Sequence, residues 1–293
     1  MKKNPVDILG IVFGLLSLAI VILSLVLLIL GHRFSMGPWM AWADNRGVGG
    51  GGKVREEGQR RFDGKTIELN IRGVSGDITI SGWEEDSVLV KYMKSAPSQP
   101  DLDNLDVEFD QRGNTLSIKP VTKTRLFQRG SISFEVFVPR DVTAIEAVSV
   151  SGDLRLVKIP DGVNQRLKTT SGRIETDNSA SLDIESVSGS LSFKFSGETL
   201  SVKTVSGNIR GELRAIERNG SIQVSSVSGA VALHVFQGIG ARVKFQSVSG
   251  TVSSDLPVTV TKSKKNQLEG SIGDGAVPFE IGTTSGEIKI AKL

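Results

Sequence analysis

The residues best suited to chemistry in this sequence are acidic. Asp106, Glu108 and Asp110 follow Asp101 and Asp103 within ten positions. Clustered carboxylates bind hard cations such as Ca²⁺, because these ions take several oxygen ligands. However, the last three carboxylates alternate with apolar residues, as the exposed positions of a β-strand do. The glycine at the sixth position of an EF-hand loop is also missing. We therefore predict an exposed strand face over the 101–110 stretch, and leave open whether it binds a cation.

Other reactive side chains are few. The chain has no cysteine and two histidines, which excludes thiol catalysis, disulfide scaffolds and cysteine zinc sites. His234 falls on the outward side of an alternating segment, so we predict an exposed side chain. Glu84 to Asp86 fit a turn. The densest basic patch, Lys262, Lys264 and Lys265, is predicted to be a solvated loop that an anionic envelope polymer could contact. We predict no catalytic residue, no cofactor and no metal site.

Residues 8–30 form an apolar run of 23 residues without a charge, long enough to cross a bilayer as a helix. A cleavable signal peptide is the alternative, with Ala41 and Ala43 flanking Trp42 in a cleavage-like motif. The run is longer than a signal peptide needs, and the motif lies too far beyond it. We predict an uncleaved transmembrane helix after a short tail, residues 1–7. Phe34, Trp39 and Trp42 fit the membrane interface. The flanking basic residues are nearly balanced, so charge does not decide the orientation.

Residues 31–61 join this anchor to the rest of the chain. Four consecutive glycines at 49–52 resemble a phosphate-binding loop, but no apolar strand precedes them and no apolar helix follows. We interpret the segment as a flexible tether. The net charge of +3, without clustering, does not indicate a nucleic-acid-binding protein.

Residues 62–293 contain a repeat built around a Val-Ser-Gly or Thr-Ser-Gly triplet. Positions −6, −4, −1, +3 and +5 from the serine are mostly apolar, and the positions between them are mostly polar. The period of two predicts short strands with one buried face. The odd step from −4 to −1 requires a bend there or at the serine-glycine pair. The predicted corners are Ser75 and Gly76, Ser151 and Gly152, Ser171 and Gly172, Ser188 and Gly189, Ser206 and Gly207, Ser228 and Gly229, Ser249 and Gly250, Ser285 and Gly286.

The repeat interval is about 16–22 residues, counting a degenerate copy at 268–272. A unit this short cannot form a sandwich and carries no crossover helix, but it suits one coil of a solenoid. We predict an all-β, single-stranded parallel β-solenoid (β-helix-like). The stretch 81–141 lacks the triplet and is predicted to form irregular coils or a hairpin layer near the anchor.

These motifs resemble the bacterial putative-adhesin family of domains of unknown function, which includes LiaG-like membrane proteins of cell-envelope stress operons. The resemblance rests on Val74 to Ile78, on Val138 to Asp141 before the copy at Ser151, and on the later triplets. It implies a β-solenoid held outside the bacterial cytoplasmic membrane by a single N-terminal helix. It implies no activity and no functional residues.

The leading hypothesis is therefore a non-enzymatic, adhesin-like module that binds an envelope polymer or a membrane protein and is anchored in the bilayer by residues 8–30. One alternative is a polysaccharide-active β-helix enzyme, which needs paired carboxylates on one face. The other is a structural solenoid that polymerises end to end. That alternative arises because the last repeat, ending at Leu293, shows no obvious cap.

Overall fold

A computed structural model describes residues 53–63, 68–123 and 129–293. No helix in these ranges is long and apolar enough to cross a membrane. The predicted transmembrane helix, residues 8–30, and the predicted interface residues Phe34, Trp39 and Trp42 lie outside the described residues, as does most of the 31–61 tether.

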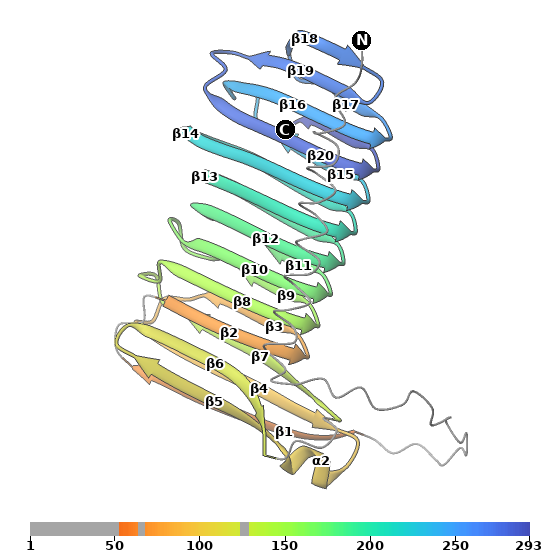
Figure 1. The fold of residues 1–293 in the computed structure, drawn as a ribbon. Coiled ribbons are helices and arrows are strands. Elements are labelled where there is room, and N and C mark those ends of the chain that lie inside the picture. Colours follow the sequence, from red (N-terminus) through yellow and green to blue (C-terminus); the bar gives the residue numbers. More distant parts are fainter. Residues whose placement is uncertain (1–52, 64–67, 124–128) are drawn as a thin grey trace, which may run out of the picture.

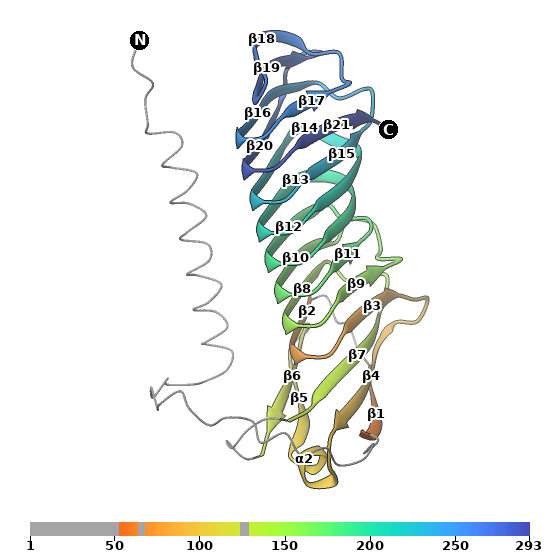
Figure 2. The same cartoon turned by 90° about the vertical axis from the view of Figure 1, so that its right-hand side faces the viewer.

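The described chain winds into a two-layered parallel β-solenoid, as the repeat predicts (Figures 1 and 2). Each regular coil contributes one long strand to one layer and one short strand to the other. The long-strand sheet contains β2 (Glu68–Ser75), β8 (Ala144–Ser151), β10 (Asn164–Ser171), β12 (Ser181–Ser188), the second parts of β13 (Leu191–Ser206) and β14 (Ile209–Ser228), β16 (Ala241–Ser249) and β20 (Val277–Ser285). The short-strand sheet contains β3 (Ile78–Gly82), β9 (Leu154–Val157), β11 (Ile174–Thr176), the first parts of β13 and β14, β15 (Val231–Val235), β17 (Val252–Ser254) and β21 (Ile288–Lys292).

Neighbouring coils stack in register, with each serine of the triplet opposite the next. Ser171 pairs with Ser151 on one side and with Ser188 on the other. Each coil alone would leave both strand edges without hydrogen-bond partners, so stacking is what makes the repeat stable.

The core lies between the two layers and is mainly aliphatic and aromatic. In the copy at Ser188, Leu182, Ile184, Leu191 and Phe193 are all at most 2% exposed. These are the −6, −4, +3 and +5 positions that the sequence pattern marks as buried.

One part of the predicted pattern is wrong. The −1 residues are not buried: Val187 is half-buried, and Val248 is 38% exposed. The −2 residues point inward instead, and each is at most 2% exposed. They are Ser149, Thr169, Ser186, Thr204, Ser226, Ser247 and Thr283. Strand alternation thus continues unbroken to the −2 position, and the whole change of direction is made at the serine-glycine pair.

The coils do not stack in the order of the sequence. The last coil, β20–β21, inserts between the β14–β15 coil and the β16–β17 coil. The first coil, β2–β3, likewise lies between β6–β7 and β8–β9. The order of the coils therefore departs from the order of the sequence at both ends of the solenoid.

The end formed by early residues contains antiparallel strand pairs, within the prediction of irregular coils or a hairpin layer for this part of the chain. β4 (Ser87–Ala96) pairs antiparallel with β1 (Val54–Asp63) and with β7 (Ser131–Val138). β5 (Leu105–Arg112) and β6 (Thr115–Thr122) form a hairpin that extends the long-strand sheet. The short helix α2 (Gln99–Asp103) packs on this end, with Leu102 buried.

The opposite end is also closed by antiparallel strands. β19 (Gln267–Ile272) pairs antiparallel with β16 and with β18 (Thr259–Lys264), whose six residues are all exposed. The segment 268–272 is therefore not a degenerate coil. The idea that the last repeat leaves an uncapped apolar end is also wrong, because β20 and β21 are interior strands and the polar strand β18 lies at the end of the sheet (Figure 1).

Candidate functional site

The serine-glycine pairs lie where each long strand turns into its short strand, and they form a continuous column along one edge of the solenoid (Figure 2). All of these glycines except Gly250 have positive φ, between 113° and 154°. A Cβ on Gly189 would collide with the carbonyl oxygen of Gly172 in the neighbouring coil. The Gly189 amide donates to the Ser206 carbonyl on the other side, at 3.1 Å. Only glycine suits both the backbone conformation and this close stacking.

Aspartates after the glycines reinforce the column. The Asp153 carboxylate accepts a hydrogen bond from the Arg173 amide in the next coil, at 2.8 Å, and Asp77 accepts one from the Asp153 amide at 2.9 Å. Asn208 does the same for Ala230 at 3.1 Å. The repeat motif is thus explained by folding, and the serine-glycine pairs carry no evident chemistry of their own.

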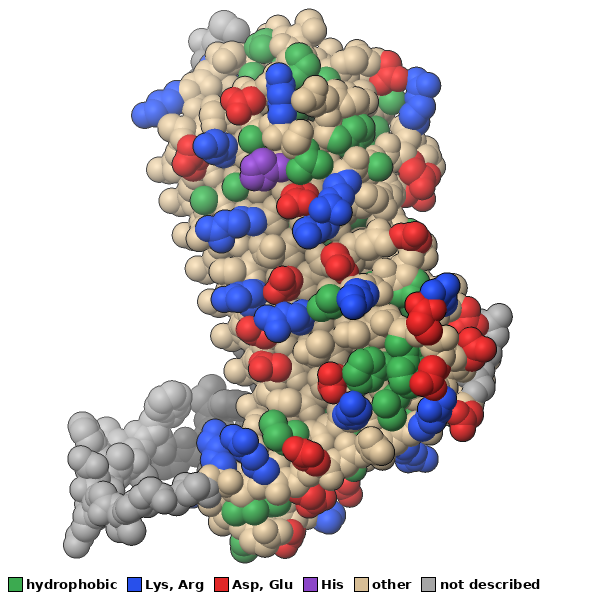
Figure 3. Space-filling view, turned by 180° about the vertical axis from the view of Figure 1, so that it is seen from behind, with side chains coloured by type: hydrophobic (Ala, Val, Ile, Leu, Met, Phe, Trp, Pro, Cys, Tyr) green, Lys and Arg blue, Asp and Glu red, His purple; other side chains and the backbone are tan. Residues whose placement is uncertain are grey.

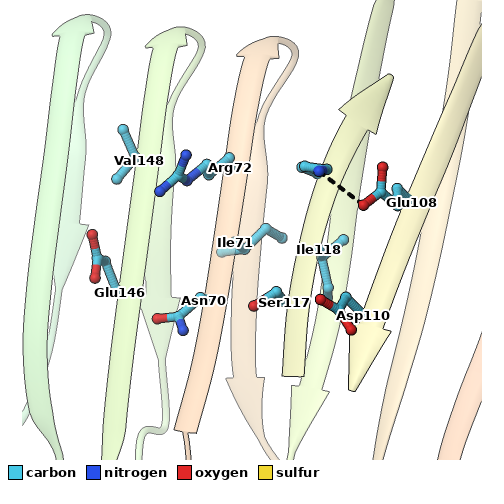
Figure 4. Close-up of a pocket in the computed structure, with 10 residues that line it drawn as sticks. Asn70, Ile71, Arg72, Glu108, Asp110, Ser117, Ile118, Glu146 and Val148 are labelled. Atoms are coloured by element: carbon cyan, nitrogen blue, oxygen red, sulfur yellow. Dashed lines mark ion pairs between the residues drawn. The ribbon is translucent and has the colours of Figure 1, made fainter. Parts of the chain in front are cut away.

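The outer face of the long-strand sheet presents a polar cleft near the hairpin end (Figure 4). β6 follows β2 only over Glu68 to Ile71 and then leaves it, while β2 continues beside β8 to Ser75. The strands separate because β6 stays paired with β5 in its hairpin. The resulting cleft has a volume of about 290 Å³.

The accessible lining of this cleft is mostly polar and charged. Ile71 and Ile118 lie beneath it with their side chains in the core, at most 1% exposed, and Val148 is 5% exposed. In Figure 4, Glu146 and Asp110 lie on opposite sides, with Asn70 and Ser117 between them. Such a lining suits a polar ligand held by hydrogen bonds and ion pairs.

Two charged groups of the cleft are free to meet a ligand. Glu108 is paired with Lys119 at 2.8 Å, and Asp110 with Arg112 at 2.9 Å. Arg72 and Glu146 form no ion pair with any residue of the described ranges. The cleft therefore offers a guanidinium for a carboxylate or phosphate and a carboxylate for an ammonium or hydroxyl group.

The acidic stretch at 101–110 does not converge on one point. Asp101 and Asp103 lie on α2, where they accept hydrogen bonds from Ser98 and Gln99. Asp106 lies on β5 with Glu108 and Asp110, as the alternating pattern predicts. Across the described part of the chain, no group of three or more histidine, aspartate or glutamate side chains could hold a metal ion.

The lysine patch, His234 and the acidic turn predicted from the sequence lie on separate elements. Lys262 and Lys264 lie on β18 rather than in a loop, and Lys265 follows in the turn to β19. His234 is exposed on the short-strand face, beside Glu212 of the adjacent strand (Figure 3). Basic and acidic side chains are interspersed over that face. Glu84 and Glu85 are bonded to Arg140 and Arg61.

An aromatic pair on the hairpin end has no counterpart in the sequence predictions. The rings of Trp83 and Phe137 lie 5.4 Å apart, with Arg61 over the first ring and Lys91 over the second. The Trp83 indole also donates to the Ser87 carbonyl at 2.7 Å. Hydrogen bonds to Glu85 and Asp63 raise the pKa of Arg61 above its ordinary value. Trp83 follows a strand and precedes an acidic turn, a position that offers no periodic signal.

Several proteins of known structure are similar to this chain, and the three described here cover 80–82% of it. One from Clostridium sporogenes, described as a putative cell adhesion protein, is 14% identical and is covered over 100% of its length, with a TM-score of 0.40. A putative adhesin from Bacteroides fragilis is 12% identical and covered over 97%, with a TM-score of 0.30. A putative lipid binding protein from Parabacteroides distasonis is 12% identical and covered over 97%, with a TM-score of 0.35.

No curated protein matches the chain. The model of the family described as Toastrack DUF4097 matches residues 63–291, nearly the whole of the predicted β-domain. The triplet motif and the predicted family resemblance agree with this match. The chain therefore belongs to the Toastrack DUF4097 family.

Proposed function

We propose that this protein is a membrane-anchored binding module without enzymatic activity, whose β-solenoid contacts a component of the cell envelope on the extracytoplasmic side. The observation that carries the proposal is the polar cleft on the outer face of the long-strand sheet, where Arg72 and Glu146 form no ion pair within the described part of the chain. The apolar run at 8–30 supports the membrane anchor.

The chemistry of the cleft favours a hydroxyl-rich ligand that carries both charges. Arg72 suits a carboxylate, Glu146 suits an ammonium group, and Asn70 and Ser117 between the walls suit hydroxyl or amide groups. Peptidoglycan fragments combine these groups in one polymer. The ligand class is therefore a zwitterionic envelope glycan, bound on an open face rather than enclosed in a reaction pocket.

The test is binding of soluble peptidoglycan fragments to the purified full-length chain in detergent, measured by calorimetry. Arg72→Glu should weaken binding at least tenfold, because it reverses the charge that meets the ligand carboxylate. The matched control is Arg210→Glu, an exposed arginine on the short-strand face, which should leave the affinity unchanged. Equal loss in both variants, or no binding by the unmodified chain, would reject the cleft as the site.

Two further measurements separate the proposal from its rivals. Protease added to intact cells should digest the β-domain, and complete protection would reject an extracytoplasmic location. Incubation with the same fragments should leave their length unchanged. Glycan shortening that is lost in Glu108→Gln or Glu146→Gln would instead support the polysaccharide-active alternative, since glycosidases use paired carboxylates.

A further inference from the structure

The two ends of the long-strand sheet both finish in strands with one unpaired edge. Among the described residues, β5 pairs only with β6, and β18 pairs only with β19. The views in Figures 1 and 2 place them at opposite ends of the solenoid. An open strand edge presents free N–H and C=O groups and is a template for another strand. Both ends can therefore accept a further strand.

The directions of the two edge strands suit each other. β6 is parallel to the coils through β2, so its partner β5 runs against them. β19 runs against β16, so β18 runs with the coils. When two copies are placed end to end along the solenoid axis, β18 of one copy is antiparallel to β5 of the next. The six residues of β18 match most of the eight residues of β5.

The net charges of the two edges are opposite, because β5 carries three carboxylates and Arg112 whereas β18 carries two lysines. Glu108, Asp110 and Lys262 each also form one ion pair within the chain. On β5, Asp106, Glu108 and Asp110 alternate on one side of the strand, and Glu108 and Asp110 line the outer face of the long-strand sheet. On β18, Lys262 and Lys264 line that same outer face at the other end. The side chains of the two edges would therefore meet on one face of a continuous sheet. Opposite charges facing each other across an antiparallel pair stabilise it.

The same charges oppose the other arrangements. Two β5 edges would place carboxylates against carboxylates, and two β18 edges would place lysines against lysines. Charged residues on an edge strand usually prevent association with any partner. Here the charges oppose β5–β5 and β18–β18 pairing and leave β18–β5 pairing favourable. The short-strand sheet contributes little to a contact between two copies, because its edge strand at the β18 end, β17, has only three residues.

We propose that the partner of each edge is a second copy of this chain, and that the solenoids assemble head to tail through antiparallel pairing of β18 with β5. The contact uses different surfaces on the two copies, so it does not close on itself and extends into a linear array. It differs from stacking through exposed apolar ends, which the hairpins at both ends exclude.

The experiment is sedimentation velocity of the purified full-length chain in detergent as a function of protein and salt concentration. Assemblies larger than a dimer should form at 50 mM salt and dissociate toward the monomer at 1 M, where the Debye length falls to about 3 Å. A chain that stays monomeric at all concentrations and both salt levels overturns the proposal.

Two charge-reversed variants test which surfaces meet. The acid-reversed variant carries Asp106→Lys, Glu108→Lys and Asp110→Lys, and the base-reversed variant carries Lys262→Glu and Lys264→Glu. Each variant alone should be monomeric, because its two ends then carry the same charge. An equimolar mixture should regain assemblies, because every β5 again meets a β18 of opposite charge.

The mixture separates a specific contact from damaged folding. Far-UV circular dichroism should be unchanged in both variants, and neither misfolded chain would recover assembly on mixing. Assembly by either variant alone, or no recovery by two folded variants, overturns the β18–β5 contact. The Arg72→Glu substitution in the cleft should leave assembly intact, so the two proposals can fail independently.

Discussion

Replacing Gly189 by alanine tests the stacking of the corners most directly. Gly189 has φ of +143°, a conformation that costs an L-residue about 1–3 kcal/mol. The new Cβ would also overlap the Gly172 carbonyl oxygen of the neighbouring coil. Relief of such an overlap by shifting packed backbone costs about a further 1–3 kcal/mol. We expect the free energy of unfolding to fall by about 2–6 kcal/mol, a large part of the stability of a typical domain.

Gly113→Ala is the matched control. Gly113 also has positive φ, +58°, in the turn between β5 and β6, but a Cβ there would meet nothing within 4 Å. This variant should lose only the conformational cost, about 1–2 kcal/mol. Urea unfolding of both full-length variants, followed by circular dichroism with the m-value compared, gives the two losses. Equal losses of unfolding free energy in Gly189→Ala and Gly113→Ala would refute the reasoning, because the close contact between stacked corners would then contribute nothing to stability.

Three further predictions concern polar groups. Gln165 is buried in the core, where it accepts a hydrogen bond from the Thr176 hydroxyl at 2.5 Å and donates one to the Asn178 carbonyl at 2.5 Å. Gln165→Leu should cost about 1–3 kcal/mol by removing both bonds, and adding Thr176→Val should recover only part of this loss in thermal melts, because the Asn178 carbonyl still lacks the amide donor. Asp153→Ala should cost about 1–2 kcal/mol in urea unfolding, because an amide of the next coil loses its charged acceptor; an unchanged midpoint would contradict the role of the carboxylate. Ser186 is buried, and its hydroxyl has no hydrogen-bond partner among the described residues, so Ser186→Ala should be neutral or stabilising. Thr169→Val should cost about 1 kcal/mol by removing a hydrogen bond to the Ser171 carbonyl. A lower melting temperature for Ser186→Ala than for Thr169→Val would contradict this.

The strands, the corners and the family could be predicted because they depend on local pattern. Leu182, Ile184 and Leu191 alternate with polar residues, and a glycine that follows a serine at regular intervals indicates a tight turn. Sequence reasoning assigned the −1 valines to the core because it weighed hydrophobicity alone. The interior narrows at the corner, where a small serine or threonine at −2 fits and Val187 is left half-buried outside.

The order of the coils could not be predicted, because each repeat presents the same edge and suits any position in the stack. Nothing local in the copy at Ser285 indicates that it lies between two earlier coils. The cleft was missed for a related reason. Arg72 and Glu146 are far apart in the sequence, and they line one cleft only because β2 pairs with β8 while β6 departs from it.

The interior position of the last coil has a consequence for biosynthesis. While the chain is emerging from the ribosome, the coils up to β14–β15 can form in succession, but the place between that coil and β16–β17 is filled only by residues 277–292, which follow both neighbours in the sequence. Loss of this segment would therefore deprive two separate coils of a neighbour at once. This part of the solenoid can thus be completed only after β16 to β19 have already been synthesised.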